Sequence, residues 1–143
     1  MYEYRCKILK VIDGDTVDVD IDLGFDIILS NQRIRLYGID TPESRTSDKE
    51  EKIYGIAAKE FLKSYLQEGN FTTLQTVKDA TGKFGRILGK FPIDQTGKTI
   101  NELLVENHHA VEYFGQSKVE IKQSHLKNRQ ILIEIALSHV RIP

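Results

Sequence analysis

The chain has 143 residues, of which 40% are hydrophobic and 29% charged, with one cysteine and a formal net charge of −1. A single cysteine excludes an internal disulfide framework and a cysteine-rich zinc site, and no apolar run approaches the roughly 18–20 residues that span a bilayer. The near-neutral charge argues against a protein that coats nucleic acid by bulk electrostatics, because such binding scales with the number of phosphates neutralised. It favours recognition by a few well-placed cations.

The first forty residues alternate between apolar and polar side chains, which is the period of a β-strand. Residues 2–12 and 17–23 carry this alternation, and the four apolar side chains of the second segment, Leu23 included, are expected to face a core. We expect a bend at Gly24 and a turn centred on Asn31, followed by a strand over residues 33–39. Connections this short predict antiparallel pairing.

A helix is expected in the middle of the chain, after a polar loop at residues 44–52. From Ile53 to Tyr65, apolar residues recur every four positions along one side of this helix. Gly69 and Asn70 suit its C-terminal end, because both tolerate the left-handed conformation.

Two further strands, at residues 71–77 and 84–91, precede the second half of the helical content. Two later segments carry a capping box, which closes a helix N-terminus: Thr99 with Glu102, and Ser117 with Glu120. The last helix is expected to run to about residue 130 or beyond. These elements predict one α+β domain over residues 1–143, built as a five-stranded barrel with about three packed helices, since closure of a sheet removes its exposed edges.

Two acidic turns carry the oxygen atoms that a hard cation prefers. Asp15 lies in the first turn, residues 13–16, and Asp40 precedes Thr41 and Pro42, where a strand must end because proline has no N–H. Calcium takes carboxylate, carbonyl and water oxygens, so the two carboxylates and the Thr41 carbonyl form an oxygen-only candidate set. The turn at residues 13–16 and the segment around Asp40 are also typical of ordinary turns. Each therefore has a purely structural explanation when taken alone.

Two arginines and a glutamate complete the candidate site. Arg35 and Arg86 lie in apolar segments and could clamp a phosphate together, with salt bridges to carboxylates as the alternative. Glu43 could accept a proton from water or orient the water, or it could be a solvated loop acid. Arg35 and Asp40 have opposite strand parity, so they converge only if Gly38 introduces a bend or a bulge. The four histidines lack the spacing of a metal site and are assigned no role.

Five motifs in a single order resemble the staphylococcal nuclease (thermonuclease) family, over roughly residues 8–128. They are Val-Ile-Asp-Gly-Asp-Thr-Val (11–17), Arg-Leu-Tyr-Gly-Ile-Asp-Thr-Pro-Glu (35–43), Tyr-Gly-Ile-Ala-Ala (54–58), Lys-Phe-Gly-Arg (83–86) and Asn-Glu-Leu-Leu-Val (101–105). The resemblance implies an OB-type barrel with three helices. It also implies a calcium-dependent nuclease that cuts DNA and RNA with little sequence preference and leaves 3′-phosphates.

The resemblance assigns roles to eight residues: calcium ligation to Asp15, Asp40 and Thr41; catalysis to Arg35, Glu43 and Arg86; substrate binding to Lys83 and Tyr113. The family's pocket tyrosines do not align cleanly beyond Tyr113, and the chain is nearly neutral where the secreted nuclease is basic. The expected partners are DNA and RNA, with no membrane, and the expected state is a monomer. The N-terminus has no basic-then-apolar signal segment, which favours a cytoplasmic over a secreted location. A noncatalytic module that binds nucleic acid or protein is the alternative function.

Overall fold

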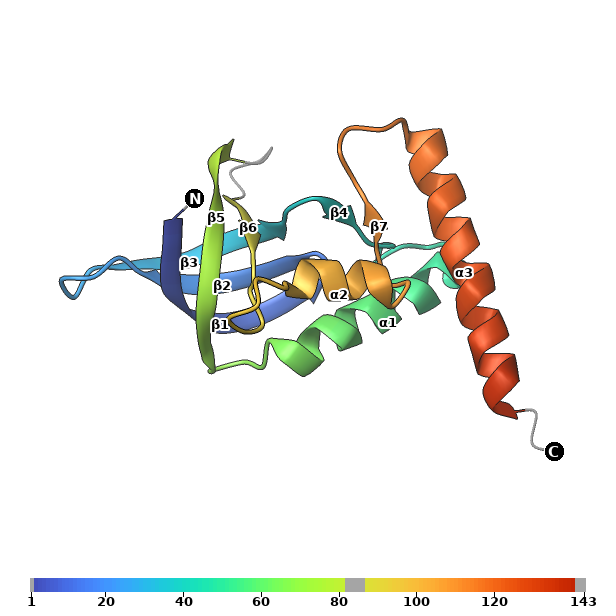
Figure 1. Cartoon of the computed structure of the whole chain (residues 1–143), viewed down its shortest axis with the longest axis horizontal. Helices are drawn as coiled ribbons and strands as arrows, with labels where there is room; N and C mark the ends of the chain where they lie inside the picture. Colours follow the sequence, from blue (N-terminus) through green and yellow to red (C-terminus); the bar gives the residue numbers. More distant parts are fainter. Residues whose placement is uncertain (1, 82–86, 141–143) are drawn as a thin grey trace.

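Seven strands and three helices form over residues 2–81 and 87–140, the residues that the computed structural model describes (Figure 1). Five strands close a barrel in the order β1-β2-β3-β6-β5: β1 (Tyr2–Asp13), β2 (Thr16–Asp22), β3 (Ile28–Leu36), β5 (Phe71–Thr81) and β6 (Ile87–Lys90). Two short strands, β4 (Ile39–Asp40) and β7 (Val111–Glu112), pair beside it. The helices are α1 (Lys49–Tyr65), α2 (Ile100–Glu106) and α3 (Lys118–Val140). The predicted α+β fold, an OB-type five-stranded barrel with three helices, is confirmed.

One strand pair departs from the expected antiparallel pattern. β3 and β6 run parallel over Ile34–Leu36, whereas the other neighbours in the barrel are antiparallel. A parallel pair needs a long crossover, and α1 and β5 supply it between these two strands. The short loops predicted antiparallel pairing of strands that are consecutive in the chain. They carry no information about β3 and β6, which are distant in sequence and close the barrel.

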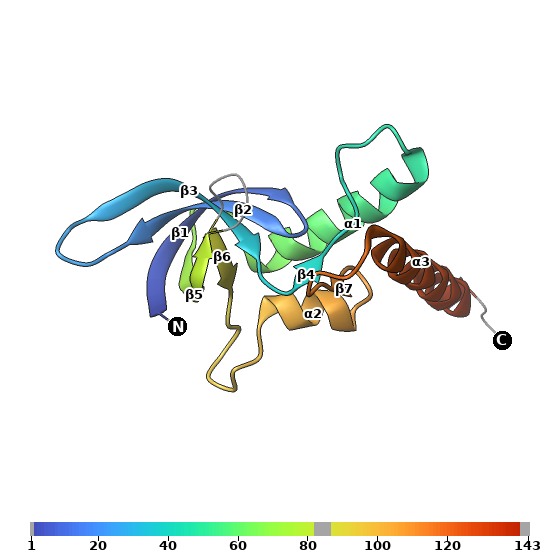
Figure 2. The same ribbon diagram turned by 90° about the horizontal axis from the view of Figure 1, so that it is seen from above.

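The alternation in residues 17–23 predicts the buried face of β2 correctly up to its end. Val17, Val19 and Ile21 are buried in the core, but Leu23 is 43% exposed. Leu23 lies beyond the last residue of β2, in the hairpin that leads to β3 and projects away from the helices (Figure 2). The alternation of apolar and polar residues therefore continues beyond the end of β2, where the barrel no longer buries the apolar side chains.

The turn expected at Asn31 is wrong, because β3 passes through this residue without a break. Asn31 has a φ of +52° and lies at a register shift, where Ile21 pairs with Leu29 and Val19 pairs with Gln32. Between these two pairs, β3 has one residue more than β2. A β-bulge accommodates an extra residue of this kind and increases the local twist. The polar residues around Asn31 thus bend one strand where we expected them to separate two.

Helix α1 has the expected period but a different start and a different buried face. It begins at Lys49, and the Asp48 carboxylate caps it by accepting from the backbone N–H groups of Glu50 and Glu51, so the last residues of the expected 44–52 loop are helical. Its buried residues are Gly55, Ala58 and Leu62. The expected face is only partly covered: Ile53 and Tyr65 are 64% and 46% exposed, whereas Phe61 is half-buried against the core. Small residues made this buried face inconspicuous in the sequence.

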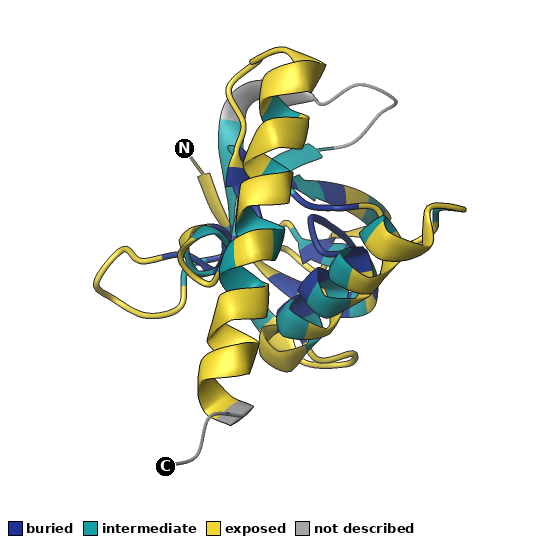
Figure 3. Ribbon diagram, turned by 90° about the vertical axis from the view of Figure 1, so that its right-hand side faces the viewer, coloured by how far each residue is buried: buried dark blue, intermediate teal, exposed yellow. Residues whose placement is uncertain are grey.

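The two helices with predicted capping boxes start where expected. The Thr99 hydroxyl accepts from the Glu102 N–H at 3.2 Å and the Ser117 hydroxyl accepts from the Glu120 N–H at 3.2 Å. Helix α3 continues to Val140 and presents most of its surface to solvent, with a narrow half-buried stripe towards the rest of the protein (Figure 3). Over residues 2–81 and 87–140, no helix combines the length and apolar character needed to cross a membrane.

Candidate active site

Gly38 brings Arg35 and Asp40 together. β3 ends at Leu36, and Gly38 has a φ of +80°, a conformation that glycine adopts at little cost. The turn resets the strand parity before β4 begins at Ile39. As a result, the Arg35 Nη2 lies 3.4 Å from the Asp40 Oδ1. The convergence that the sequence left conditional on a bend at Gly38 is present.

The second acidic turn meets the same arginine from the other side. Asp15 is buried, with its Oδ2 3.1 Å from the Arg35 Nη1. The same carboxylate accepts from the Thr41 backbone N–H at 3.2 Å and from the Thr16 hydroxyl at 3.0 Å. Asp15, Arg35, Asp40 and Thr41, which span 26 residues of sequence, therefore form one cluster.

Helix α1 holds the two acidic turns in contact, because glycines allow backbones to approach closely. A Cβ on Gly55 would lie 2.1 Å from the carbonyl oxygen of Glu43, and a Cβ on Gly14 would lie 2.7 Å from the Cβ of Ala58. Between the turns, the Ser44 hydroxyl donates to the Asp13 carboxylate. Glu43 thus lies on a rigid support close to the cluster.

Several carboxylates lie close together in the cluster and raise one another's pKa values. Burial raises the pKa of the Asp15 carboxyl; Arg35 opposes this shift and Asp40 adds to it. Partial burial also raises the pKa of Glu43, and so do the charges of four nearby carboxylates: Asp13, Asp15, Asp40 and Glu51. Among the described residues, Arg35 is the arginine that pairs with these acids, and a bound cation would add to its stabilisation of their charge.

The donor set fits a hard cation. Among the described residues no group of three or more His, Cys, Asp or Glu side chains is arranged to hold a metal ion, so side chains would supply two carboxylates and the backbone and water the rest. Asp15 and Asp40 offer oxygen only, and each carboxylate oxygen can accept more than one contact. The Thr41 hydroxyl is buried and has no hydrogen-bond partner within residues 2–81 and 87–140, which leaves one more oxygen beside the two acids.

Tyr113 lies where two surface hollows meet, each of about 570 Å³. One hollow is lined by Arg35, Gly38 and Phe114, and the other lies between α3 and the segment that follows Asp40; Tyr113 and Asp40 line both. Tyr113 is 42% exposed, so its ring is available to a ligand. The remaining two predicted site residues, Lys83 and Arg86, lie outside the described residues.

His125 of α3 is a site residue to which the sequence analysis assigned no role. Its Nε2 lies 2.8 Å from the Asp40 Oδ2, so Asp40 bridges His125 and Arg35. The two residues are 85 positions apart, and no local spacing relates them. Only a prediction of how α3 packs against β4 could have found this contact.

Comparison with known proteins identifies the family of the chain. The family model described as "Staphylococcal nuclease homologue" matches residues 33–132. A protein named endonuclease YhcR from Bacillus subtilis (strain 168) is 30% identical over 117 residues, which cover 78% of this chain and 9% of that protein. The thermonuclease of Staphylococcus hyicus is 34% identical over 60% of this chain and 47% of its own length, and that of Staphylococcus intermedius is 38% identical over 55% and 43%.

The chain spans less than half the length of each of these three relatives. The family match nevertheless covers most of the chain, including Arg35, Asp40, Thr41, Glu43 and Tyr113. The chain therefore belongs to the staphylococcal nuclease homologue family.

Proposed function

We propose that this protein is a calcium-dependent nuclease that hydrolyses phosphodiester bonds of DNA and RNA with little sequence specificity and leaves 3′-phosphates. The observation that carries the proposal is the convergence of Asp15, Arg35 and Asp40 from two separate turns. The nuclease names of the relatives support the reaction class. The oxygen-only donor set supports calcium over a softer metal.

In the proposed reaction the arginines bind the phosphate. Arg35 uses three contacts to hold its place, with Asp15, Asp40 and the Leu36 carbonyl, and a guanidinium has five N–H donors. The remaining donors are free to bind a phosphate oxygen on which charge develops. Arg86 is assigned the second half of this clamp, and Lys83 a contact to the nucleotide, from their sequence motif alone.

Glu43 is proposed to accept a proton from the attacking water, or to orient that water. Its raised pKa makes it a better proton acceptor than an ordinary exposed glutamate. Asp15, Asp40 and the Thr41 carbonyl would hold calcium, which when bound supplies Lewis-acid stabilisation of the phosphate oxygens. Tyr113 would contact the nucleotide.

The test is cleavage of single- and double-stranded DNA and RNA with calcium and with EDTA. Glu43→Gln is expected to lower the rate by about 10²-fold or more, since loss of one transition-state group costs about that much. Glu68→Gln, an exposed carboxylate remote from the cluster, is the matched control and should retain full activity. Arg86→Ala tests the second arginine in the same way.

Two results would contradict the proposal. Substrate that stays intact with calcium would favour the noncatalytic binding module instead, and equal cleavage with EDTA would remove the metal from the mechanism. We also predict that residues 1–143 form one domain and that the protein is a monomer. The elution volume of the purified chain in size-exclusion chromatography tests the monomer.

A further inference from the structure

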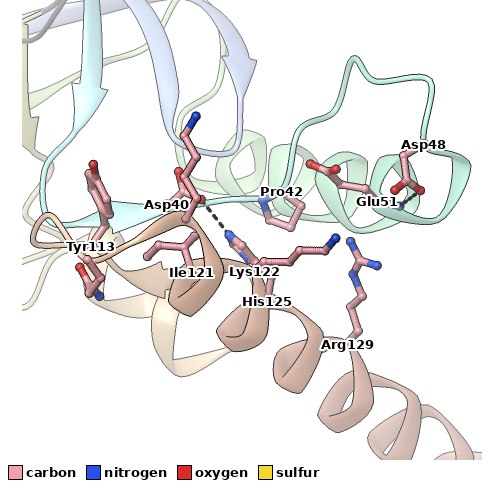
Figure 4. A pocket seen from close by; sticks show the side chains of 11 residues that line it. Asp40, Pro42, Asp48, Glu51, Tyr113, Ile121, Lys122, His125 and Arg129 are labelled. Atoms are coloured by element: carbon pink, nitrogen blue, oxygen red, sulfur yellow. Dashed lines mark hydrogen bonds and ion pairs between the residues drawn. The ribbon is translucent and has the colours of Figure 1, made fainter.

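We infer that the groove between α3 and the segment following Asp40 binds the phosphates of nucleic acid beyond the scissile bond. The inference rests on the proposed function, because it extends the same site. Lys118, Lys122 and Arg129 line this groove from α3. Figure 4 shows Lys122 and Arg129 there, together with His125, which contacts Asp40. None of these residues belongs to the motifs that predicted the active site.

The cations form one face of α3. Lys118, Lys122, His125 and Arg129 are separated by four, three and four residues, the spacing of a single helix face. Eleven residues of helix extend about 16 Å, and phosphates of one strand in a duplex rise about 3.4 Å each. The row is thus long enough to follow roughly three to five nucleotides.

Among the described residues, Lys118, Lys122 and Arg129 of this row are not held in ion pairs with a carboxylate. Arg129 instead lies over the Tyr54 ring at 5.2 Å, and its Nε is buried without a hydrogen-bond partner. A row of charges held on a rigid helix without protein partners is suited to an anionic ligand.

The opposite wall of the groove carries the carboxylates of Asp48 and Glu51. The Asp48 carboxylate caps α1, and the Glu51 carboxylate accepts from the Glu43 backbone N–H at 3.0 Å. The wall formed by α1 is therefore acidic and the wall formed by α3 is basic. A polyanion that enters the groove is expected to follow α3.

The groove continues directly from the proposed reaction site. Asp40 and Tyr113 line both this groove and the hollow that contains Arg35. A strand whose scissile phosphate contacts Arg35 can therefore pass Tyr113 and place its following phosphates along α3. Because the chain's net charge is −1, binding of a long substrate depends on localised rows of cations such as this one.

The experiment measures binding without turnover. Fluorescein-labelled single-stranded DNA of three and of ten nucleotides is titrated with protein in EDTA and followed by anisotropy. The test variant combines Lys118→Gln and Lys122→Gln, both exposed residues. The control combines Lys10→Gln and Lys127→Gln, which are also exposed, line neither groove, and remove the same charge.

For the ten-nucleotide DNA, the test variant is expected to weaken binding by about tenfold at low salt. The slope of log K against log salt should fall in magnitude by about 1.4, which is two contacts at about 0.7 each. The test variant's affinity for the trinucleotide should change by less than about twofold. The control variant's affinity for the ten-nucleotide DNA should also change by less than about twofold.

Three outcomes would overturn the inference: unchanged binding of the ten-nucleotide DNA, an equal loss in the control variant, or an equal loss for the trinucleotide. The proposed function is judged separately, from cleavage with calcium. A protein that binds the longer DNA through α3 but never cleaves it would contradict the nuclease proposal alone. A protein that cleaves but binds without these lysines would contradict this inference alone.

Discussion

We predict that Gly55→Ala destabilises the protein, although alanine has the higher helix propensity. Alanine in place of glycine inside a helix is ordinarily favourable by about 1 kcal/mol. At Gly55, however, the added Cβ would lie 2.1 Å from the Glu43 carbonyl oxygen and 2.6 Å from the Ser44 backbone nitrogen. Both atoms belong to backbone, so no side-chain rotation can relieve the contact.

The size of the effect follows from these distances. Ordinary contact is about 3.5 Å, so the Glu43–Ser44 segment must move away from α1 by roughly 1.4 Å. Overpacking of this kind costs about 1–3 kcal/mol. Over most of that range, the cost exceeds the gain of about 1 kcal/mol in helix propensity. After subtraction of that gain, we expect Gly55→Ala to lower the free energy of unfolding by up to about 2 kcal/mol. Misplacement of Glu43 by about 1 Å should also lower cleavage by about 10²-fold.

Urea unfolding followed by circular dichroism measures the first effect, and initial cleavage rates with calcium measure the second. Ser64→Ala is the matched control, because Ser64 is exposed on the same helix and the change raises propensity without a clash. The control should be neutral or stabilising by about 0.5 kcal/mol. If Gly55→Ala is as stable as the control and fully active, the contact between α1 and the Glu43 segment does not constrain the site.

Three further predictions test other parts of the structure. Burial raises the pKa of the Cys6 thiol to about 11, so at pH 8 this thiol should stay unreactive towards a disulfide reagent in the native protein and react at once in urea; fast native reaction would contradict its burial. Burial lowers the pKa of His109, with a smaller contribution from His108, so the unfolded chain binds the proton more tightly and the free energy of unfolding should fall as pH drops below about 6.5. His109→Gln should reduce this dependence between pH 7.5 and 5.5, and an identical dependence in the variant would refute the assignment. His125→Ala should weaken calcium binding by about tenfold in calorimetry, because a carboxylate's hydrogen-bond partner orients it for the metal; unchanged affinity would show that His125 does not position Asp40.

Local patterns in the sequence predicted the elements whose stability is itself local. The alternation of Val17, Val19 and Ile21 is a property of one strand, and the capping residues Thr99 and Ser117 act within one helical turn. Such signals hold because the hydrogen bonds and the period involve neighbours in the chain. The same locality explains the errors: at Asn31 a polar pattern typical of a turn is used for a bulge, which only the pairing of β2 with β3 decides.

The buried face of α1 was misassigned for a different physical reason. Gly55 and Ala58 are buried because other backbones approach them closely, and a sequence pattern ranks positions by apolar size. Ile53 has the larger apolar side chain yet remains exposed. Close approach between segments is a tertiary property, so small residues carry it without an apolar signal.

By itself, the sequence determined which chemical groups this protein has available: two acidic turns, two arginines in apolar segments and a glutamate after a proline. It also determined that Gly38 had to bend the chain if Arg35 and Asp40 were to meet. Only the tertiary structure decided that Asp15 joins them, that α1 supports Glu43, and that His125 and the basic face of α3 lie beside Asp40. These contacts join segments up to 85 residues apart, and they form where closure of the barrel and packing of the helices bring distant segments together, which no local pattern records.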